Sequence, residues 1–90
     1  MSRADNNQAE IVRALRSVGV TVHITSQVGE GFPDLVCGYF GKNFLIEVKN
    51  PAARGKLRAT QEIFRDKWKG NVHVVNSIQE ALAVVGVTLT

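Results

Sequence analysis

The chain has 90 residues, of which 44% are apolar, and a formal net charge of +3. This length fits one small domain, residues 1–90, with a single hydrophobic core. No run approaches the roughly 18 apolar residues that a membrane-spanning helix needs, and the first ten residues lack the apolar stretch of a signal peptide. We therefore expect a soluble, cytoplasmic protein without a membrane partner.

Cysteine and histidine are scarce. The single cysteine, Cys37, has no partner for an internal disulfide and lies in an apolar run, where free cysteines behave as small buried residues. No cysteine or histidine accompanies His23 at zinc-ligand spacing, which does not favour a zinc site. A basic chain is compatible with a polyanionic partner, although the distribution of the charge is more informative than its total.

The first predicted element is a helix over residues 5–18, followed by Gly19. Asn7 and Glu10 at its start resemble a capping box. Glu10 has two interpretations: a first-turn acid that stabilises the helix, or an acid at the border of the apolar stripe that can reach a metal site. The apolar stripe, at helical spacing, consists of Ile11, Val12, Leu15 and Val18.

Residues 20–26 alternate between apolar and polar side chains, which is typical of a half-buried strand, with His23 on the polar face. A glycine-rich loop follows, and Pro33 then restricts the backbone and fixes how Asp34 enters the next strand. Glu30 in this loop is interpreted as a solvated charge, with an approach to metal or DNA left open.

Two further strands are predicted over residues 34–40 and 43–49, rich in Val, Ile, Phe and Tyr. The intervening Gly41 and Lys42 fit a two-residue hairpin loop with glycine in its first position. These two strands are therefore antiparallel neighbours.

Three charged side chains share one face of this hairpin: Asp34, Glu47 and Lys49. With the two-residue loop, Asp34 lies opposite Lys49 and diagonal to Glu47, with side-chain bases about 5–8 Å apart. A four-residue loop places Asp34 directly opposite Glu47 instead. Both registers keep the three charges together, and only a one-residue slip separates them.

Basic residues continue after the second of these strands. No acid interrupts the series Lys49, Arg54, Lys56 and Arg58. These residues either form a solvated loop or contact a phosphate backbone and bring it to the acidic pair.

A helix is predicted over residues 56–69, before Gly70. Its inward stripe is expected to contain Leu57, Gln61, Phe64 and Trp68. A buried amide needs polar neighbours, so Gln61 either faces the strand that carries Glu47 or bonds to backbone at the edge of the core.

Residues 71–75 predict a fourth strand, with His73 facing away from Val72 and Val74. Ser77 and Glu80 form a second capping box that opens a helix through about residue 85. The order is helix, three strands, helix, strand, helix. This pattern predicts a layered α/β domain.

Two carboxylates at this spacing suit a hard divalent cation such as Mg²⁺ or Mn²⁺, which takes oxygen ligands and keeps waters for a phosphate substrate. Lys49 beside them can orient an attacking water or stabilise developing negative charge. Phosphodiester hydrolysis fits this set, whereas the simpler alternative is a cross-strand ion pair without catalysis.

The residues Pro33-Asp34, followed after twelve residues by Glu47-Val48-Lys49, resemble the PD-(D/E)XK nuclease signature. The segment GFPDLV, the following EVK and a glutamine-bearing helix are most similar to the VRR-NUC family in its stand-alone, virus-type form. These features occur in the family's order over about two-thirds of the chain.

The resemblance implies an αβββαβ restriction-endonuclease-like core, here with a C-terminal helix and a mixed sheet flanked by helices. It implies Asp34, Glu47 and the Val48 carbonyl as ligands of Mg²⁺ or Mn²⁺, and Lys49 as the residue that orients water. It also implies Gln61 as a site residue and Glu10 as the acid of the N-terminal helix.

For function, the resemblance implies a homodimeric, metal-dependent DNA endonuclease that selects branched or four-way junction DNA, located in the host-cell cytoplasm if the protein is viral. Residues expected to bind DNA are Arg54, Lys56 and Arg58. One alternative is a catalytically silent nucleic-acid-binding module of the same fold, which would not need Asp34, Glu47 and Lys49. Another is a purely structural protein, which leaves Gln61 and the basic series unexplained.

Overall fold

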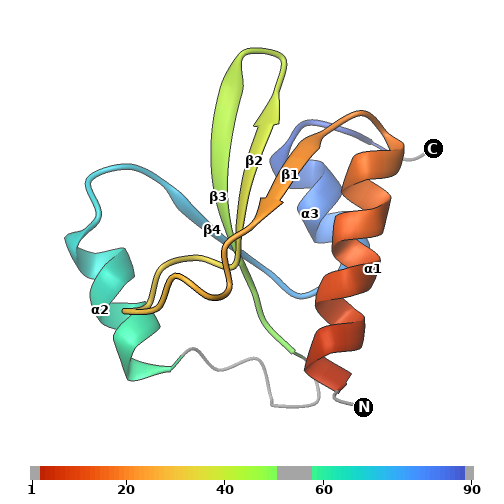
Figure 1. The fold of residues 1–90 in the computed structure, drawn as a ribbon. Helices are drawn as coiled ribbons and strands as arrows, with labels where there is room; N and C mark the ends of the chain where they lie inside the picture. Colours follow the sequence, from red (N-terminus) through yellow and green to blue (C-terminus); the bar gives the residue numbers. More distant parts are fainter. Residues whose placement is uncertain (1–2, 51–57, 89–90) are drawn as a thin grey trace.

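A computed structural model describes residues 3–50 and 58–88 of the protein (Figure 1). The elements, in chain order, are α1 (Arg3–Ser17), β1 (Thr21–Ile24), β2 (Leu35–Tyr39), β3 (Lys42–Val48), α2 (Ala59–Lys67), β4 (Val72–Val75) and α3 (Ile78–Val84). This order confirms the predicted series of helices and strands. Within the described residues, no helix has both the length and the apolar character required to cross a membrane.

The strands form one four-stranded sheet in the order β1-β2-β3-β4. Neighbouring strands are antiparallel from β1 to β3, whereas β4 is parallel to β3, so the sheet is mixed. Helices α1 and α3 lie together on one side of the sheet, and α2 lies on the other side (Figure 1). The predicted α/β fold with a mixed sheet flanked by helices is therefore present.

The core lies between the sheet and the α1–α3 pair. Cys37 is 1% exposed, as predicted, and burial raises the pKa of its thiol to about 11, so it behaves as a packing residue. The sheet contributes Val22, Leu35, Cys37, Ile46 and Val75 to this core, and the helices contribute Ile11, Val12, Leu15, Ala81 and Leu82.

The predicted capping box at Asn7 and Glu10 is wrong. Helix α1 begins at Arg3, so Asn7 lies inside the helix, where its side-chain amide donates a hydrogen bond to the Lys49 carbonyl at 2.8 Å. The second capping residue is confirmed at the start of α3, where the Ser77 hydroxyl accepts from the Glu80 N–H at 3.1 Å. Its reciprocal bond differs from the standard box, because the Glu80 carboxylate accepts from the Asn76 N–H.

The predicted hairpin loop at Gly41 and Lys42 is also wrong. Tyr39 pairs with Lys42, so the two-residue turn consists of Phe40 and Gly41. Both have left-handed backbones, with φ values of 49° and 76°, as a type I′ turn requires. Type I′ turns match the right-handed twist of the flanking strands, and here Gly41 takes the second central position instead of the first.

Helix α2 is shorter than predicted, and part of the predicted stripe does not face the sheet. Trp68 follows the helix and is 43% exposed. The ring of Phe64 stacks on Trp68 at 5.0 Å and meets the edge of Phe32 at 5.5 Å. The helix therefore packs Phe64 against Phe32 in the loop before β2, and Leu57 lies outside the described residues.

Candidate functional site

The Pro33-Asp34 corner is held by the end of β1. The Thr25 N–H donates to the Asp34 carbonyl at 2.7 Å, and the Thr25 hydroxyl donates to the Pro33 carbonyl at 2.7 Å. Pro33 is fully buried. These contacts fix the backbone at the point where the chain enters β2.

Asp34 and Glu47 lie opposite each other. The observed register pairs Leu35 with Ile46, so the next position along the two strands sets Asp34 beside Glu47. This is the second of the two registers considered from the sequence, reached through a two-residue turn. Since Leu35 and Ile46 face the core, the two carboxylates emerge on the opposite face of the sheet.

Hydrogen bonds connect the pair to the strand ends. Asp34 Oδ2 accepts from the Val48 N–H at 2.8 Å, and Glu47 is only 2% exposed. Burial is the main cause that raises the pKa of Glu47 to about 8, followed by the negative charge and hydrogen bond of Asp34, against which the charge of Arg58 acts. Burial also raises the pKa of Asp34, opposed by the Val48 N–H, the Glu47 hydrogen bond and Arg58.

These pKa shifts have a direct chemical meaning. Two facing acids in a partly dehydrated position resist being ionised together, so one of them retains a proton unless a cation compensates the second negative charge. The pair is therefore a place where a positive ion is electrostatically favoured.

Gln61 joins α2 to this pair. It is buried, and its Nε2 donates to Glu47 Oε2, while its Oε1 accepts from the Arg58 N–H at 2.8 Å. The expectation that the amide meets the strand face of Glu47 is confirmed, and the amide bonds to backbone as well. One side chain thus caps the start of α2 and orients the Glu47 carboxylate.

Gly31 permits the close approach of α2, which sequence reasoning missed. Its φ is 79°, and a Cβ placed there would lie 2.1 Å from the Thr60 carbonyl oxygen. Only glycine fits at this contact, and without it the first turn of α2 could not bring Gln61 to Glu47. The glycines on both sides of Glu30 were visible in the sequence, but a close approach has no pattern of its own.

The other predicted residues are placed as follows. Lys49 follows β3, is half-buried, and its N–H donates to the Val75 carbonyl at 2.8 Å. Arg58 is the exposed residue that precedes α2, close enough for its charge to lower the pKa of both acids. Glu10 is exposed on α1. Arg54 and Lys56 lie outside the described residues.

The oxygen atoms of Asp34 and Glu47 can be compared with the ligands that a metal ion requires. Within the residues 3–50 and 58–88, no three His, Cys, Asp or Glu side chains gather, so Glu10 does not join Asp34 and Glu47 there. Mg²⁺ is usually bound by one or two carboxylates and keeps several waters. Two carboxylates with raised pKa values, beside the backbone of Val48, fit that requirement for Mg²⁺ or Mn²⁺.

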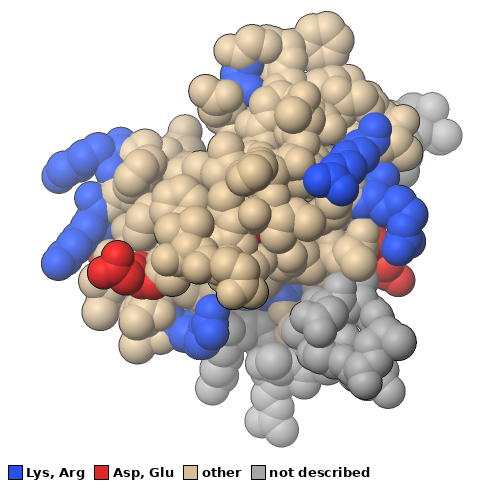
Figure 2. Space-filling view, viewed as in Figure 1, with Lys and Arg blue, Asp and Glu red and all other residues tan. Residues whose placement is uncertain are grey.

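Several basic side chains lie on or near α2. Arg65, Lys67 and Lys69 are exposed on or just after this helix. In the space-filling view, Lys and Arg side chains gather on the side of the molecule where α2 lies, next to a smaller acidic area (Figure 2). The helix itself carries two exposed acids, Glu62 and Asp66, so the excess of positive charge in this region comes from Arg58 and Lys69 at its two ends.

Comparisons of the chain with protein-family models, with curated proteins and with solved structures gave no match.

Proposed function

We propose that this protein is a metal-dependent DNA endonuclease that hydrolyses phosphodiester bonds and prefers branched DNA, with the restriction-endonuclease-like core of the VRR-NUC family. The supporting observation is the position of Asp34 directly opposite Glu47. Like charges directly opposite each other destabilise a sheet. Because Asp34 faces Glu47 and not Lys49, a simple cross-strand ion pair does not explain the arrangement, whereas a divalent cation would stabilise both carboxylates in their ionised form.

In this proposal, the Asp34 and Glu47 carboxylates and the Val48 carbonyl hold Mg²⁺ or Mn²⁺. Such an ion, when bound, lowers the pKa of a water and neutralises charge on the phosphate. The hydrogen bond from Gln61 keeps Glu47 in one orientation, which preorganises the site.

Lys49 follows Glu47 by two positions, so its side chain leaves the extended chain on the same face. We propose that its ammonium group orients the attacking water and stabilises the negative charge that develops on phosphate. A bond forms between the water oxygen and phosphorus, and one ester P–O bond breaks. The water releases one proton to solvent and the leaving oxygen takes one up from solvent, so a phosphate monoester and a hydroxyl remain. In this proposal, Arg58 binds the phosphate backbone of the DNA together with Arg54 and Lys56.

A homodimer completes the proposal, because two copies would present two such sites to a branched DNA.

The test compares cleavage by wild type, Asp34→Asn and Glu47→Gln on single-stranded, duplex, flapped and four-way junction DNA with Mg²⁺ or Mn²⁺. Each substitution keeps the side-chain shape and removes one negative charge, so we expect cleavage to fall at least about 100-fold, the usual scale for one transition-state contact. DNA binding measured in parallel separates catalysis from binding alone.

Glu62→Gln is the matched control, because Glu62 is an exposed acid next to Gln61 and its loss should leave cleavage unchanged. Full cleavage by both Asp34→Asn and Glu47→Gln would refute the proposed site. Binding without cleavage in the wild type on every substrate would instead identify a catalytically silent nucleic-acid-binding module.

A further inference from the structure

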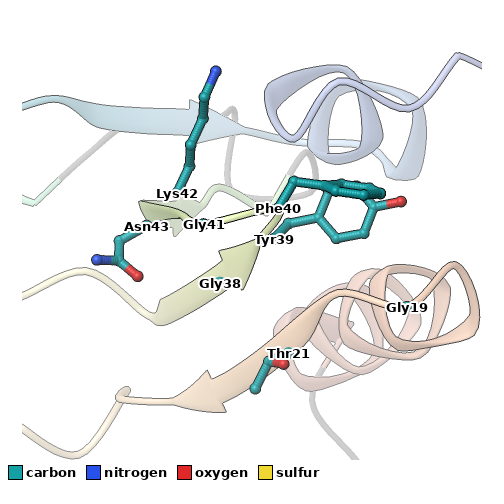
Figure 3. Close-up of a pocket in the computed structure, with 8 residues that line it drawn as sticks. All are labelled: Gly19, Thr21, Gly38, Tyr39, Phe40, Gly41, Lys42 and Asn43. Carbon is teal, nitrogen blue, oxygen red and sulfur yellow. The ribbon is translucent and has the colours of Figure 1, made fainter.

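Phe40 and Trp68 are the most exposed large aromatic side chains in the described part of the chain, and they differ in what surrounds them. Phe40 lies on the turn of the β2–β3 hairpin, with its ring against Tyr39 and the neighbouring Lys42 extending in another direction (Figure 3). Trp68 lies at the end of α2, the helix that reaches the carboxylate pair. Trp68 is therefore the exposed ring whose position relates to the candidate site.

The indole of Trp68 is held in place on two sides. It stacks on the ring of Phe64, with centroids 5.0 Å apart and planes at 20°, and Phe64 meets the edge of Phe32 at 5.5 Å. A Cβ added at Gly70 would lie 2.9 Å from the indole Nε1, so the chain passes close to that edge. The 43% of Trp68 that remains exposed lies away from these contacts. This surface is ordered in advance and loses little conformational entropy when it binds a partner.

Trp68 lies on the side of α2 that begins at the carboxylate pair. Its N–H donates to the Phe64 carbonyl at 2.9 Å, which keeps it in the helical spacing. It follows Gln61, which contacts Glu47, by seven residues, so the two share one side of the helix about 10 Å apart along its axis. Arg65 comes four residues after Gln61 and three before Trp68, the spacings of neighbours on a helix surface. A basic side chain thus lies between the exposed indole and the acids.

The end of α2 carries more positive than negative charge. Arg65, Lys67 and Lys69 are exposed there, with one exposed acid, Asp66, among them. Positive charges near the end of a helix complement its dipole, but that effect does not require an exposed tryptophan. Surfaces that bind single-stranded nucleic acid combine basic side chains for the phosphates with aromatic rings on which bases stack. Both are present at this end of α2.

The apolar surface of α2 does not suit a protein partner. Ile63, its other exposed large apolar side chain, is 54% exposed and precedes Trp68 by five residues. Five residues turn a helix by about 140° beyond a full turn, so the two side chains lie on different sides of α2. They do not form the contiguous apolar patch that marks a protein-binding surface. A single exposed ring among basic side chains instead suits a flat base attached to phosphates.

We propose that Trp68 is a stacking platform for an unpaired base of the DNA, with Arg65 at a phosphate between that base and the bond that is cut. This inference rests on the proposed nuclease function and adds to it a reason to select branched DNA, because a fully paired duplex offers no free base. The length of about 10 Å between Gln61 and Trp68 along α2 corresponds to about three nucleotides at 3.4 Å each. The platform thus recognises an unpaired base near the cleavage position.

Trp68 is the only tryptophan of the chain, so the intrinsic fluorescence of the unmodified protein reports on this one side chain. The wild type is titrated, without divalent metal, with single-stranded oligothymidylate, flapped DNA and a fully paired duplex of equal length. Fluorescence anisotropy of labelled DNA, measured in parallel, gives the saturation of binding. Because a stacked base quenches an indole, we expect a loss of emission with oligothymidylate and flapped DNA and none with duplex.

Unchanged emission at saturation with flapped DNA would overturn the platform. A wild type that binds neither oligothymidylate nor flapped DNA would overturn it as well.

Two substitutions at Trp68 test the contact through affinity. Trp68→Leu keeps an apolar contact with Phe64 but has no flat ring. We expect it to bind flapped DNA about 5- to 150-fold more weakly, the range of one stacking contact, and duplex within about twofold of wild type. Trp68→Phe keeps a stacking ring, and Ile63→Ala removes an exposed apolar side chain from another side of α2. These two matched controls should bind flapped DNA within about twofold of wild type.

Arg65→Gln tests the phosphate contact. It should lower the slope of log affinity for oligothymidylate against log salt concentration by about 0.7, the contribution of one phosphate of a single strand. An unchanged slope would contradict the position of Arg65 at a phosphate.

The two proposals can fail separately. A wild type that cleaves nothing, but whose emission falls with flapped DNA, would refute the nuclease and support the platform. Cleavage that is lost in Asp34→Asn, with no change of emission at saturation with flapped DNA, would support the nuclease and refute the platform. Equal losses of affinity for flapped DNA and duplex in Trp68→Leu, together with a halved molecular mass in solution, would assign Trp68 to a contact between two copies and overturn the platform.

Discussion

The two ends of the β2–β3 hairpin differ in which kind of side chain they bury and which they expose. At one end, two carboxylates lie together in a mostly buried position and are held by Val48 and Gln61. At the other end, an aromatic ring is exposed on a strained turn. Ordinary folding would reverse both choices, since acids favour solvent and Phe favours the core.

The stability of the fold explains neither the buried carboxylates nor the exposed ring. The strands between the two ends explain why the protein can tolerate both. Leu35, Cys37 and Ile46 are buried under α1 and α3 and set the register of the two strands. A well-packed middle can tolerate unfavourable residues at its ends. The comparison teaches that a well-packed middle supports two ends whose residues the fold itself does not require, and each end can be perturbed separately.

The largest effect is expected at the carboxylate end from Gly31→Ala. The new Cβ would collide with the Thr60 backbone and force α2 away from β3, so Gln61 loses its contact with Glu47. We expect the free energy of unfolding to fall by about 3 kcal/mol, the scale of strain combined with the loss of a buried contact. Urea denaturation measures this change.

Gly29→Ala is the matched control. Gly29 has a similar left-handed backbone, with a φ of 86°, but no atom lies within 4 Å of an added Cβ. It should lose only the strain contribution of about 1 kcal/mol. Equal destabilisation by the two substitutions would show that the contact between Gly31 and Thr60 does not position α2.

A second, smaller effect concerns the pH dependence of stability. The pKa of Glu47 is raised from 4.5 to about 8 in the folded protein, so between these values the folded state binds a proton that the unfolded state releases. The free energy of unfolding of the metal-free protein must therefore fall as pH rises from about 5 to 8. Glu47→Gln cannot ionise and should be more stable than wild type at pH 8 by about 2 kcal/mol.

Thermal unfolding at pH 5 and pH 8 measures this difference, with Glu62→Gln as an exposed-acid control that keeps the wild-type slope. Addition of Mg²⁺ or Mn²⁺ at pH 8 should raise the Tm of wild type but not of Glu47→Gln, because the cation binds the ionised pair. A wild type and Glu47→Gln that respond identically to pH and metal would contradict the assignment of this pair as a cation site.

Much of the carboxylate end could be predicted from the sequence because alternation in strands fixes which side chains share a face. That rule placed Asp34 with Glu47, and the need to satisfy a buried amide linked Gln61 to the same face. The rule could not choose between two hairpin registers that differ by two residues, because both keep every side chain on the same face. Local turn preference favoured the wrong one.

Tertiary contacts were the least predictable part. Helical spacing indicated an apolar stripe through Trp68, but it does not identify the packing surface, which is the loop at Phe32. The amide of Asn7 looked like a helix cap and instead reaches the Lys49 carbonyl. Such contacts depend on elements that are distant in the chain, so a local pattern contains no signal for them.

The smallest effect is expected at the hairpin tip, where Phe40→Asn should stabilise the protein. Asn tolerates the left-handed backbone that Phe40 adopts and gives the preferred Asn-Gly turn. We expect a gain of about 0.5–1 kcal/mol, or a Tm increase of a few degrees for a domain of this size, measured by thermal unfolding.

Phe40→Ala separates the two contributions at this position, because Ala also removes the ring but keeps the unfavourable left-handed backbone. It should therefore gain little or nothing where Phe40→Asn gains stability. A loss of stability in Phe40→Asn as large as that in Phe40→Ala would show that the contact with Tyr39 outweighs the strain, and that Phe40 serves the fold. A gain in Phe40→Asn would show instead that the exposed ring is kept at the expense of stability, so that it serves a purpose other than the fold.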